Sequence, residues 1–195
     1  MAKSNGPQDI IERTVTLSGF MPLMFDRYAG GNTTQLPVDA KLYYMPDGKT
    51  LCFPAGNLLS FLSAKNTTSV ARLIGGKNQG KLADALLAFV QISPACIPIT
   101  REGTPITFNG FVDGRDEQAG LYVDQRVARL PKGIPNFKER PVVNLPWEVS
   151  FQIRLFKNDV VDETLLKEAF RKGGLAIGLG TFRGLFGKFV IESWE

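Results

Sequence analysis

The chain has 195 residues, 44% of them hydrophobic, and a net charge of +4. This length and apolar content are enough to bury one substantial core. Histidine is absent, which excludes histidine-based general bases, catalytic triads and metal sites. Cys52 and Cys96 are too few for a disulfide framework or a four-cysteine zinc site, so a reducing cytoplasm is expected. No cofactor is expected. No membrane partner is expected either, because no run of about 18 apolar residues occurs.

The first half of the chain predicts one strand, a hairpin and then helices. Residues 1–12 are expected to form a mobile lead-in to a single domain over 13–195. Alternating β-branched and polar residues predict a strand over 14–18. Residues 41–54 predict a hairpin around Pro46, Asp47 and Gly48. Helices are expected from Gly56 or Asn57 onward, within 67–76 and over 81–90.

The second half predicts strands, one helix and a last strand. Short strands are expected over 95–99, 105–111 and 121–130, in a β-rich arm inserted around 100–146. The clearest alternation runs over 147–156, and a helix follows with Asp162 as its N-cap and Gly173 as its C′ stop. The final strand is expected over 188–194. This order predicts an α+β fold with an antiparallel, ferredoxin-like or RRM-like sheet and large insertions.

Two glycine segments were compared with nucleotide-binding motifs, and neither fits. Residues 173–189, GGLAIGLGTFRGLFGKF, follow a helix and place Arg183 where a dinucleotide motif needs glycine. Residues 75–82, GGKNQGKL, place Leu82 where a P-loop needs serine or threonine. The glycines of the first segment are interpreted either as turn and packing residues or as positions where backbone approaches another chain closely. The candidates for close backbone approach are Gly178, Gly180, Gly184 and Gly187.

Basic residues gather in segments that are candidates for contact with a nucleic-acid backbone. Between Arg126 and Arg140 there are five cations against Glu139 alone. Phe137, Phe182 and Phe186 are candidates for stacking on bases, although such rings more often anchor a loop. A solvated charged loop, or ion pairing with nearby acids, remains an alternative for the cations. The predicted binding residues are Arg126, Arg129, Lys132, Lys138, Arg140, Arg183, Lys188, Lys77, Lys81 and Arg27.

The acidic residues do not predict a catalytic or metal site. Asp26 lies in the loop after the first strand, where capping a turn or forming a salt bridge is the favoured role. Asp113, Asp116 and Glu117 supply hard oxygen atoms but no calcium-loop pattern. We therefore expect no catalytic residue and no bound metal, with a metal-dependent nuclease using these acids as the alternative.

The order of these motifs resembles the RAMP superfamily, the RRM-like proteins of CRISPR effector complexes. Gly174, Gly178, Gly180, Arg183 and Gly187 are similar to the glycine-rich segment that leads into that superfamily's last strand. Residues 14–31, TVTLSGFMPLMFDRYAGG, resemble the first strand and loop of its backbone subunits. Residues 49–64, KTLCFPAGNLLSFLSA, resemble its hairpin-to-helix segment. The middle of the chain is unmatched, and the chain is short for a backbone subunit.

The resemblance implies a function in binding rather than catalysis. Backbone subunits of this superfamily polymerise along RNA and hold its phosphates. The resemblance therefore implies a self-associating protein that binds single-stranded nucleic acid, with RNA favoured over DNA. The absence of histidine argues against RNA maturation of the kind that some members perform. A compact member encoded by a phage or mobile element, and a module that mimics a CRISPR backbone subunit within a protein complex, remain alternatives.

Overall fold

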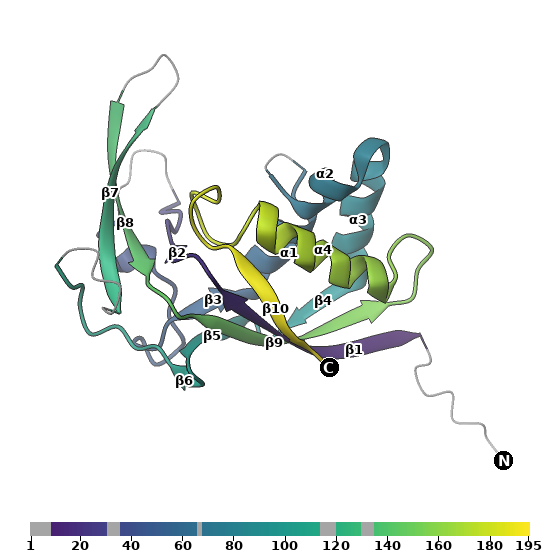
Figure 1. The fold of residues 1–195 in the computed structure, drawn as a ribbon, viewed down its shortest axis with the longest axis horizontal. Helices are drawn as coiled ribbons and strands as arrows, with labels where there is room; N and C mark the ends of the chain where they lie inside the picture. Colours follow the sequence, from purple (N-terminus) through teal and green to yellow (C-terminus); the bar gives the residue numbers. More distant parts are fainter. Residues whose placement is uncertain (1–8, 31–35, 66–67, 114–119, 130–134) are drawn as a thin grey trace.

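The structure is a computed structural model that describes residues 9–30, 36–65, 68–113, 120–129 and 135–195 (Figure 1). Side chains at 128, 129, 135 and 136 lie outside the description. A main antiparallel sheet carries helices on one side, and a long hairpin extends away from it (Figure 1). The α+β prediction is confirmed.

The main sheet has the strand order of a ferredoxin-like fold. Its path is β10 (Phe189–Trp194), β1 (Ile10–Gly19), β9 (Glu148–Phe156), β5 (Cys96–Arg101) and β3 (Cys52–Pro54). β4 (Val90–Ser93) also pairs with β9, and β6 (Thr104–Pro105) pairs with β5. The last strand therefore lies beside the first, and the first lies beside the strand that precedes the last helix. This is the arrangement that the split βαβ pattern predicts.

The helices cover one face of this sheet, as Figure 1 shows. They are α1 (Ala55–Ser63), α2 (Val70–Ile74), α3 (Gln79–Phe89) and α4 (Glu163–Ala176), with short 3₁₀ turns η1 (Asp39–Lys41) and η2 (Gly76–Asn78). Within the described ranges, none of these helices is long and apolar enough to cross a membrane. Asp162 caps α4 as expected, because its carboxylate accepts a 2.7 Å hydrogen bond from the Leu165 N–H.

Aromatic packing fixes the helices on the sheet. The ring of Phe61 on α1 lies 6.0 Å from that of Phe170 on α4 and 5.7 Å from that of Phe189 on β10. All three side chains are fully buried. Truncating such a phenylalanine costs about 3–5 kcal/mol, so this cluster contributes much of the energy that holds α1 and α4 together.

The face of the sheet away from the helices is polar. In the β1–β9 register, Val15 opposes Phe151 and Leu17 opposes Val149 on the buried face. The residues between them point the other way and pair as Thr14 with Gln152 and Thr16 with Ser150. Period-2 alternation explains this division, which is typical of an antiparallel sheet with one solvated face.

The arm predicted around residues 100–146 contains a long hairpin. β7 (Leu121–Arg129) and β8 (Pro135–Val143) pair over nine positions, and β2 (Leu23–Met24) adds to the base of β8. The hairpin rises from the sheet near the C-terminal loop that precedes β10 (Figure 1). The segment around β2 is thus brought beside both the hairpin and the loop that precedes β10.

Two expectations for the first part of the chain differ from the structure. β1 begins at Ile10, inside the expected lead-in. The turn around Asp47 forms, because its Oδ1 accepts from the Lys49 and Thr50 N–H groups. The expected paired strands beside it are reduced to one bridge between Tyr44 and Leu51, because the rest of this segment pairs elsewhere.

The prediction that α4 stops at Gly173 is wrong, because that glycine serves packing between helices. A Cβ atom there would lie 2.4 Å from Phe61 Cζ and 2.5 Å from Val70 Cγ2. The helix ends instead near Gly178, whose φ of 84° is left-handed and whose N–H donates back to the Gly173 carbonyl.

Candidate nucleic-acid interface

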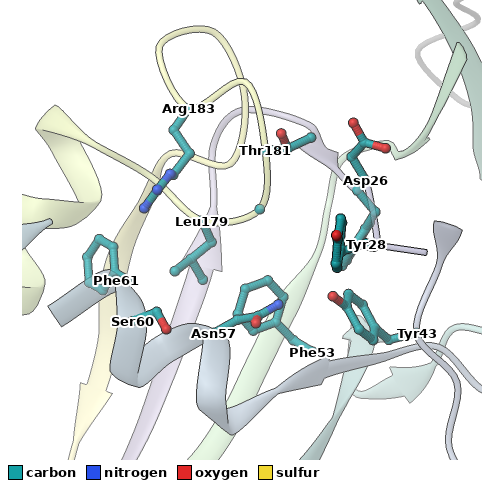
Figure 2. Close-up of a pocket in the computed structure, with 12 residues that line it drawn as sticks. Asp26, Tyr28, Tyr43, Phe53, Asn57, Ser60, Phe61, Leu179, Thr181 and Arg183 are labelled. Atoms are coloured by element: carbon teal, nitrogen blue, oxygen red, sulfur yellow. The ribbon is translucent and has the colours of Figure 1, made fainter. Parts of the chain in front are cut away.

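A pocket of about 280 Å³ lies between the start of α1, the segment after β2 and the C-terminal glycine loop, defined here as residues 178–187 (Figure 2). Its polar and charged wall residues include Asp26, Asn57, Ser60, Thr181 and Arg183. Three segments that are far apart in the sequence therefore meet at one cavity.

Close backbone packing builds the glycine loop against β2. The Thr181 N–H donates to the Met24 carbonyl at 2.9 Å, and the Gly187 N–H donates to the Pro22 carbonyl at 2.7 Å. Gly180 and Gly187 both have positive φ. A Cβ on Gly180 would lie 2.3 Å from the Met24 oxygen, and one on Gly187 would lie 2.0 Å from the Leu179 oxygen. Glycine is therefore required at position 180 for the contact with β2, and at position 187 for the close approach of the two sides of the loop.

The other two glycines of the predicted set differ from each other. A Cβ on Gly178 would lie 2.8 Å from the Phe186 carbonyl oxygen. A Cβ on Gly184 would meet nothing within 4 Å, and this residue is exposed. Three of the four glycines thus allow the chain to approach its own backbone, and Gly184 has open space around it.

Arg183 extends from the glycine loop toward the α1 side of the pocket, as Figure 2 shows. The residue is half-buried. Burial lowers the pKa of its guanidinium below the ordinary value for arginine. Among the described residues no carboxylate pairs with it. A desolvated cation of this kind favours an anion from outside the chain.

The opposite wall of the pocket is aromatic. Tyr28 and Tyr43 stand across the cavity from Arg183 (Figure 2). Tyr28 is 68% exposed. The guanidinium of Arg27, one of the predicted binding residues, lies 5.8 Å from the Tyr43 ring centroid and makes a cation–π contact with that ring. A flat π surface beside a cation suits a base next to its phosphate.

Asp26 and Arg140 form an ion pair at the edge of the pocket. Arg140 Nε donates to Asp26 Oδ2 at 2.8 Å, and Arg140 is 8% exposed. The Nη1 atom of Arg140 is buried and has no hydrogen-bond partner among the residues that the structure describes. The salt-bridge role expected for Asp26 is confirmed. Arg140 therefore holds the hairpin to the segment after β2.

Arg126 is also engaged within the protein. Its Nε and Nη2 atoms donate to the two carboxylate oxygens of Asp124 at 2.6 and 3.1 Å. Its guanidinium lies 5.3 Å from the Phe182 ring centroid and 5.0 Å from that of Phe186. Hydrogen bonding to Asp124 raises the pKa of Arg126. The hairpin and the glycine loop meet at this side chain.

The remaining predicted cations are spread over the surface. Lys138 lies opposite Arg126 on β8 and is half-buried. The Lys188 carbonyl accepts from the Phe20 and Met21 N–H groups. Lys77 on η2 and Lys81 on α3 are exposed and do not line the pocket. The side chain of Arg129 and all of Lys132 lie outside the described residues. Contact of these groups with nucleic acid stays a prediction.

The segment that resembles a P-loop lacks the required surroundings. Residues 75–82 follow α2 rather than a strand and continue through η2 into α3.

The acidic cluster near residue 113 is only partly described. Asp113 is exposed, and Asp116 and Glu117 lie outside the described residues. In the ranges that the structure describes, no group of three acids or cysteines is arranged to hold a metal ion.

The sequence did not mark Tyr28, Tyr43, Asn57 or Ser60 as pocket residues. Asn57 and Ser60 are three residues apart on a mostly apolar helix, so they share one face. That spacing is a signal for a polar site. The two tyrosines lie outside regular strands and helices, where no periodicity marks them.

Comparison with known proteins shows similarity in fold. No family model matches the chain, and no curated protein matches it. The structure is similar to a chain in the cryo-EM structure of the Type III-B Cmr-beta bound to cognate target RNA. The TM-score is 0.57 and the sequence identity 13%, and the match covers 96% of this chain and 60% of that one. This chain thus spans less than two thirds of the length of its structural neighbour, and it shares with it the α+β, RRM-like fold.

Proposed function

We propose that this protein binds single-stranded RNA without reading its sequence, and that one phosphate of the strand sits against Arg183. The observation that carries this proposal is the half-buried Arg183 guanidinium, which faces a pocket and has no carboxylate partner among the described residues. A phosphate supplies the missing charge and hydrogen-bond acceptors. Ser60 and Thr181, which line the same pocket, are suited to contact sugar or phosphate oxygens.

The aromatic wall supports a nucleotide rather than a free anion. Tyr28 and Tyr43 lie across the pocket from Arg183 (Figure 2). Stacking on aromatic rings is worth about 1–3 kcal/mol per base and tolerates any base. The cavity of about 280 Å³ accommodates part of one nucleotide and is open to solvent, as a continuous strand requires.

The polar face of the sheet argues against binding in the usual RRM manner. That manner stacks bases on aromatic residues in the middle of the open face. Here the central pairs of that face are Thr14 with Gln152 and Thr16 with Ser150. We therefore place the strand on the side of the pocket and the β7–β8 hairpin.

The resemblance to the RAMP superfamily and the RNA bound in the structural neighbour's assembly make RNA the favoured nucleic acid. We extend the proposal to self-association along the strand. Val127 and Phe137 support it: they oppose each other on the hairpin and are 58% and 57% exposed. Exposed apolar pairs on a projecting element are typical of contacts with another protein. A place in a larger CRISPR-type complex is the alternative use of the same surface.

Fluorescence anisotropy with a labelled oligouridine of about 12 nucleotides tests the proposal, a length chosen to exceed one typical site. Arg183→Gln should weaken binding and lower the slope of log affinity against log salt by about 0.7, the value for one phosphate on a single strand. Arg171→Gln is the control, because Arg171 is an exposed arginine of α4 that pairs with Glu168. Equal affinities and slopes for wild type and Arg183→Gln would contradict the proposal.

A further inference from the structure

Arg126 joins the hairpin to the glycine loop through two kinds of contact. Two of its N–H groups donate to Asp124, whose side chain is 1% exposed, so the guanidinium is held in a fixed plane. That plane lies over the rings of Phe182 and Phe186, at 5.3 and 5.0 Å. Cation–π contacts of this geometry contribute most when the cation is partly desolvated. The ion pair therefore orients Arg126 for the stack.

The two phenylalanines flank Arg183 in the sequence. Phe186 is buried, whereas Phe182 is 43% exposed and has a left-handed φ of 53°. A non-glycine residue in that conformation is strained, so it needs contacts that hold it. Phe182 packs edge-on against Phe186 at 6.4 Å, and the stack with Arg126 adds to this contact.

Phe186, at the end of the tip (residues 182–186), is anchored in a buried cluster with Met24, Tyr122 and Val142. Few other contacts fix the rest of the tip within the described part of the chain. Backbone hydrogen bonds to the segment 22–24 come from Thr181 and Gly187, which lie on either side of the tip. Among the described residues, the hydrogen bond within the tip is the one from the Leu185 N–H to the Phe182 carbonyl, at 3.2 Å. Gly184 has open space around it. The orientation of Arg183 therefore depends strongly on the side chains of Phe182 and Phe186.

We propose that Arg126 is a positioning residue: it holds the tip of the glycine loop so that Arg183 faces the pocket, and it contacts no phosphate itself. This inference rests on the proposed function for its effect on RNA binding. It differs from the expectation drawn from the sequence, in which Arg126 contacts the phosphate backbone of the nucleic acid. The difference follows from its hydrogen bonds to Asp124 and its position over the two rings.

The first test is independent of RNA. Hydrogen–deuterium exchange of the amides of residues 182–186 is measured in wild type, Arg126→Gln and Arg126→Lys. We expect exchange at the tip to rise roughly threefold to tenfold in Arg126→Gln, in line with the loss of a cation–π contact, and less in Arg126→Lys. Exchange in β1 and β9 serves as the internal reference. Unchanged exchange at the tip would overturn the inference, whatever the protein binds.

The second test separates positioning from phosphate contact. Affinity for the oligouridine is measured against salt for Arg126→Gln, Phe182→Leu and the double variant. We expect each single variant to weaken binding about threefold to tenfold with an unchanged salt slope, because no phosphate contact is removed. The double variant should bind about as well as either single one, since both lose the same contact. A slope lowered by about 0.7 in Arg126→Gln, and lowered by the same amount again when Arg126→Gln is added to Arg183→Gln, would show a separate phosphate contact by Arg126 and overturn the inference.

The outcomes distinguish this inference from the proposed function. If wild type fails to bind RNA, the proposed function fails, and the exchange measurement still decides whether Arg126 holds the loop. If RNA binds and Arg126→Gln changes neither affinity nor exchange, the positioning role alone is overturned.

Discussion

Arg140 Nε donates a 2.8 Å hydrogen bond to Asp26 Oδ2, joining β8 to the segment after β2 across 114 positions of sequence. Arg140 is almost completely buried, so the Asp26 carboxylate is the counter-charge that offsets the cost of burying it. We expect Asp26→Asn to lower the free energy of unfolding by about 1–3 kcal/mol, because the arginine is left without a counter-charge. Urea denaturation measures this. Asp159→Asn, at an exposed site, is the control and should change stability by less than about 0.5 kcal/mol.

Gly187 and Gly184 should respond differently to the same substitution. Gly187→Ala adds a Cβ atom 2.0 Å from the Leu179 oxygen and forces alanine into a left-handed φ of 70°. We expect it to destabilise the protein by about 2 kcal/mol or more, since the left-handed conformation alone costs about 1–2 kcal/mol. Gly184→Ala meets nothing within 4 Å and should be neutral or slightly stabilising. Equal melting temperatures for the two variants would contradict the packing described for the loop.

The Arg13–Glu163 ion pair predicts a dependence of stability on pH. Hydrogen bonds from Arg13 and Trp194 lower the pKa of Glu163 below its ordinary value of 4.5. A lowered folded-state pKa adds stability that is fully present above pH 4.5 and is lost as the pH falls through the folded value. Glu163→Gln should therefore be less stable than wild type at pH 7, and the difference should shrink below pH 4.5. A difference that stays constant between pH 7 and pH 3 would show that the charge of Glu163 is not involved.

We expect RNA to remain intact in the presence of Mg²⁺ or Mn²⁺. The Asp26 carboxylate is bonded to the Arg140 guanidinium, and a divalent cation would have to displace that partner. Gel analysis of labelled RNA incubated with each metal checks this. Cleavage that disappears in Asp26→Asn, with binding retained, would support the alternative of a metal-dependent nuclease.

The sequence predicted the elements whose signals are local. The alternation of Val149, Phe151 and Ile153 marks β9 because one face of that strand is buried. Asp162 marks the start of α4 because its side chain bonds a backbone group three residues away. Such signals need no knowledge of distant contacts.

The features that the sequence did not predict depend on distant partners. Gly173 matches the usual helix-ending glycine, yet Phe61 and Val70 make it a packing position inside α4. The contact of Gly180 with the Met24 oxygen joins residues that the sequence separates by almost the whole chain. Arg126 has the pattern of a free cation on an arm, and only the fold brings Phe182 and Phe186 beneath it.

The position of the RNA on the protein is the measurement that tests the account most directly. Ultraviolet crosslinking of bound oligouridine, followed by mass spectrometry of the crosslinked peptides, identifies the residues next to the bases. We predict crosslinks at Tyr28 or Tyr43, on the wall across the pocket from Arg183, and their loss in Arg183→Gln. Crosslinks confined to the polar sheet face around Thr16 and Ser150, or to the α2–α3 side near Lys77 and Lys81, would contradict a binding site at this pocket.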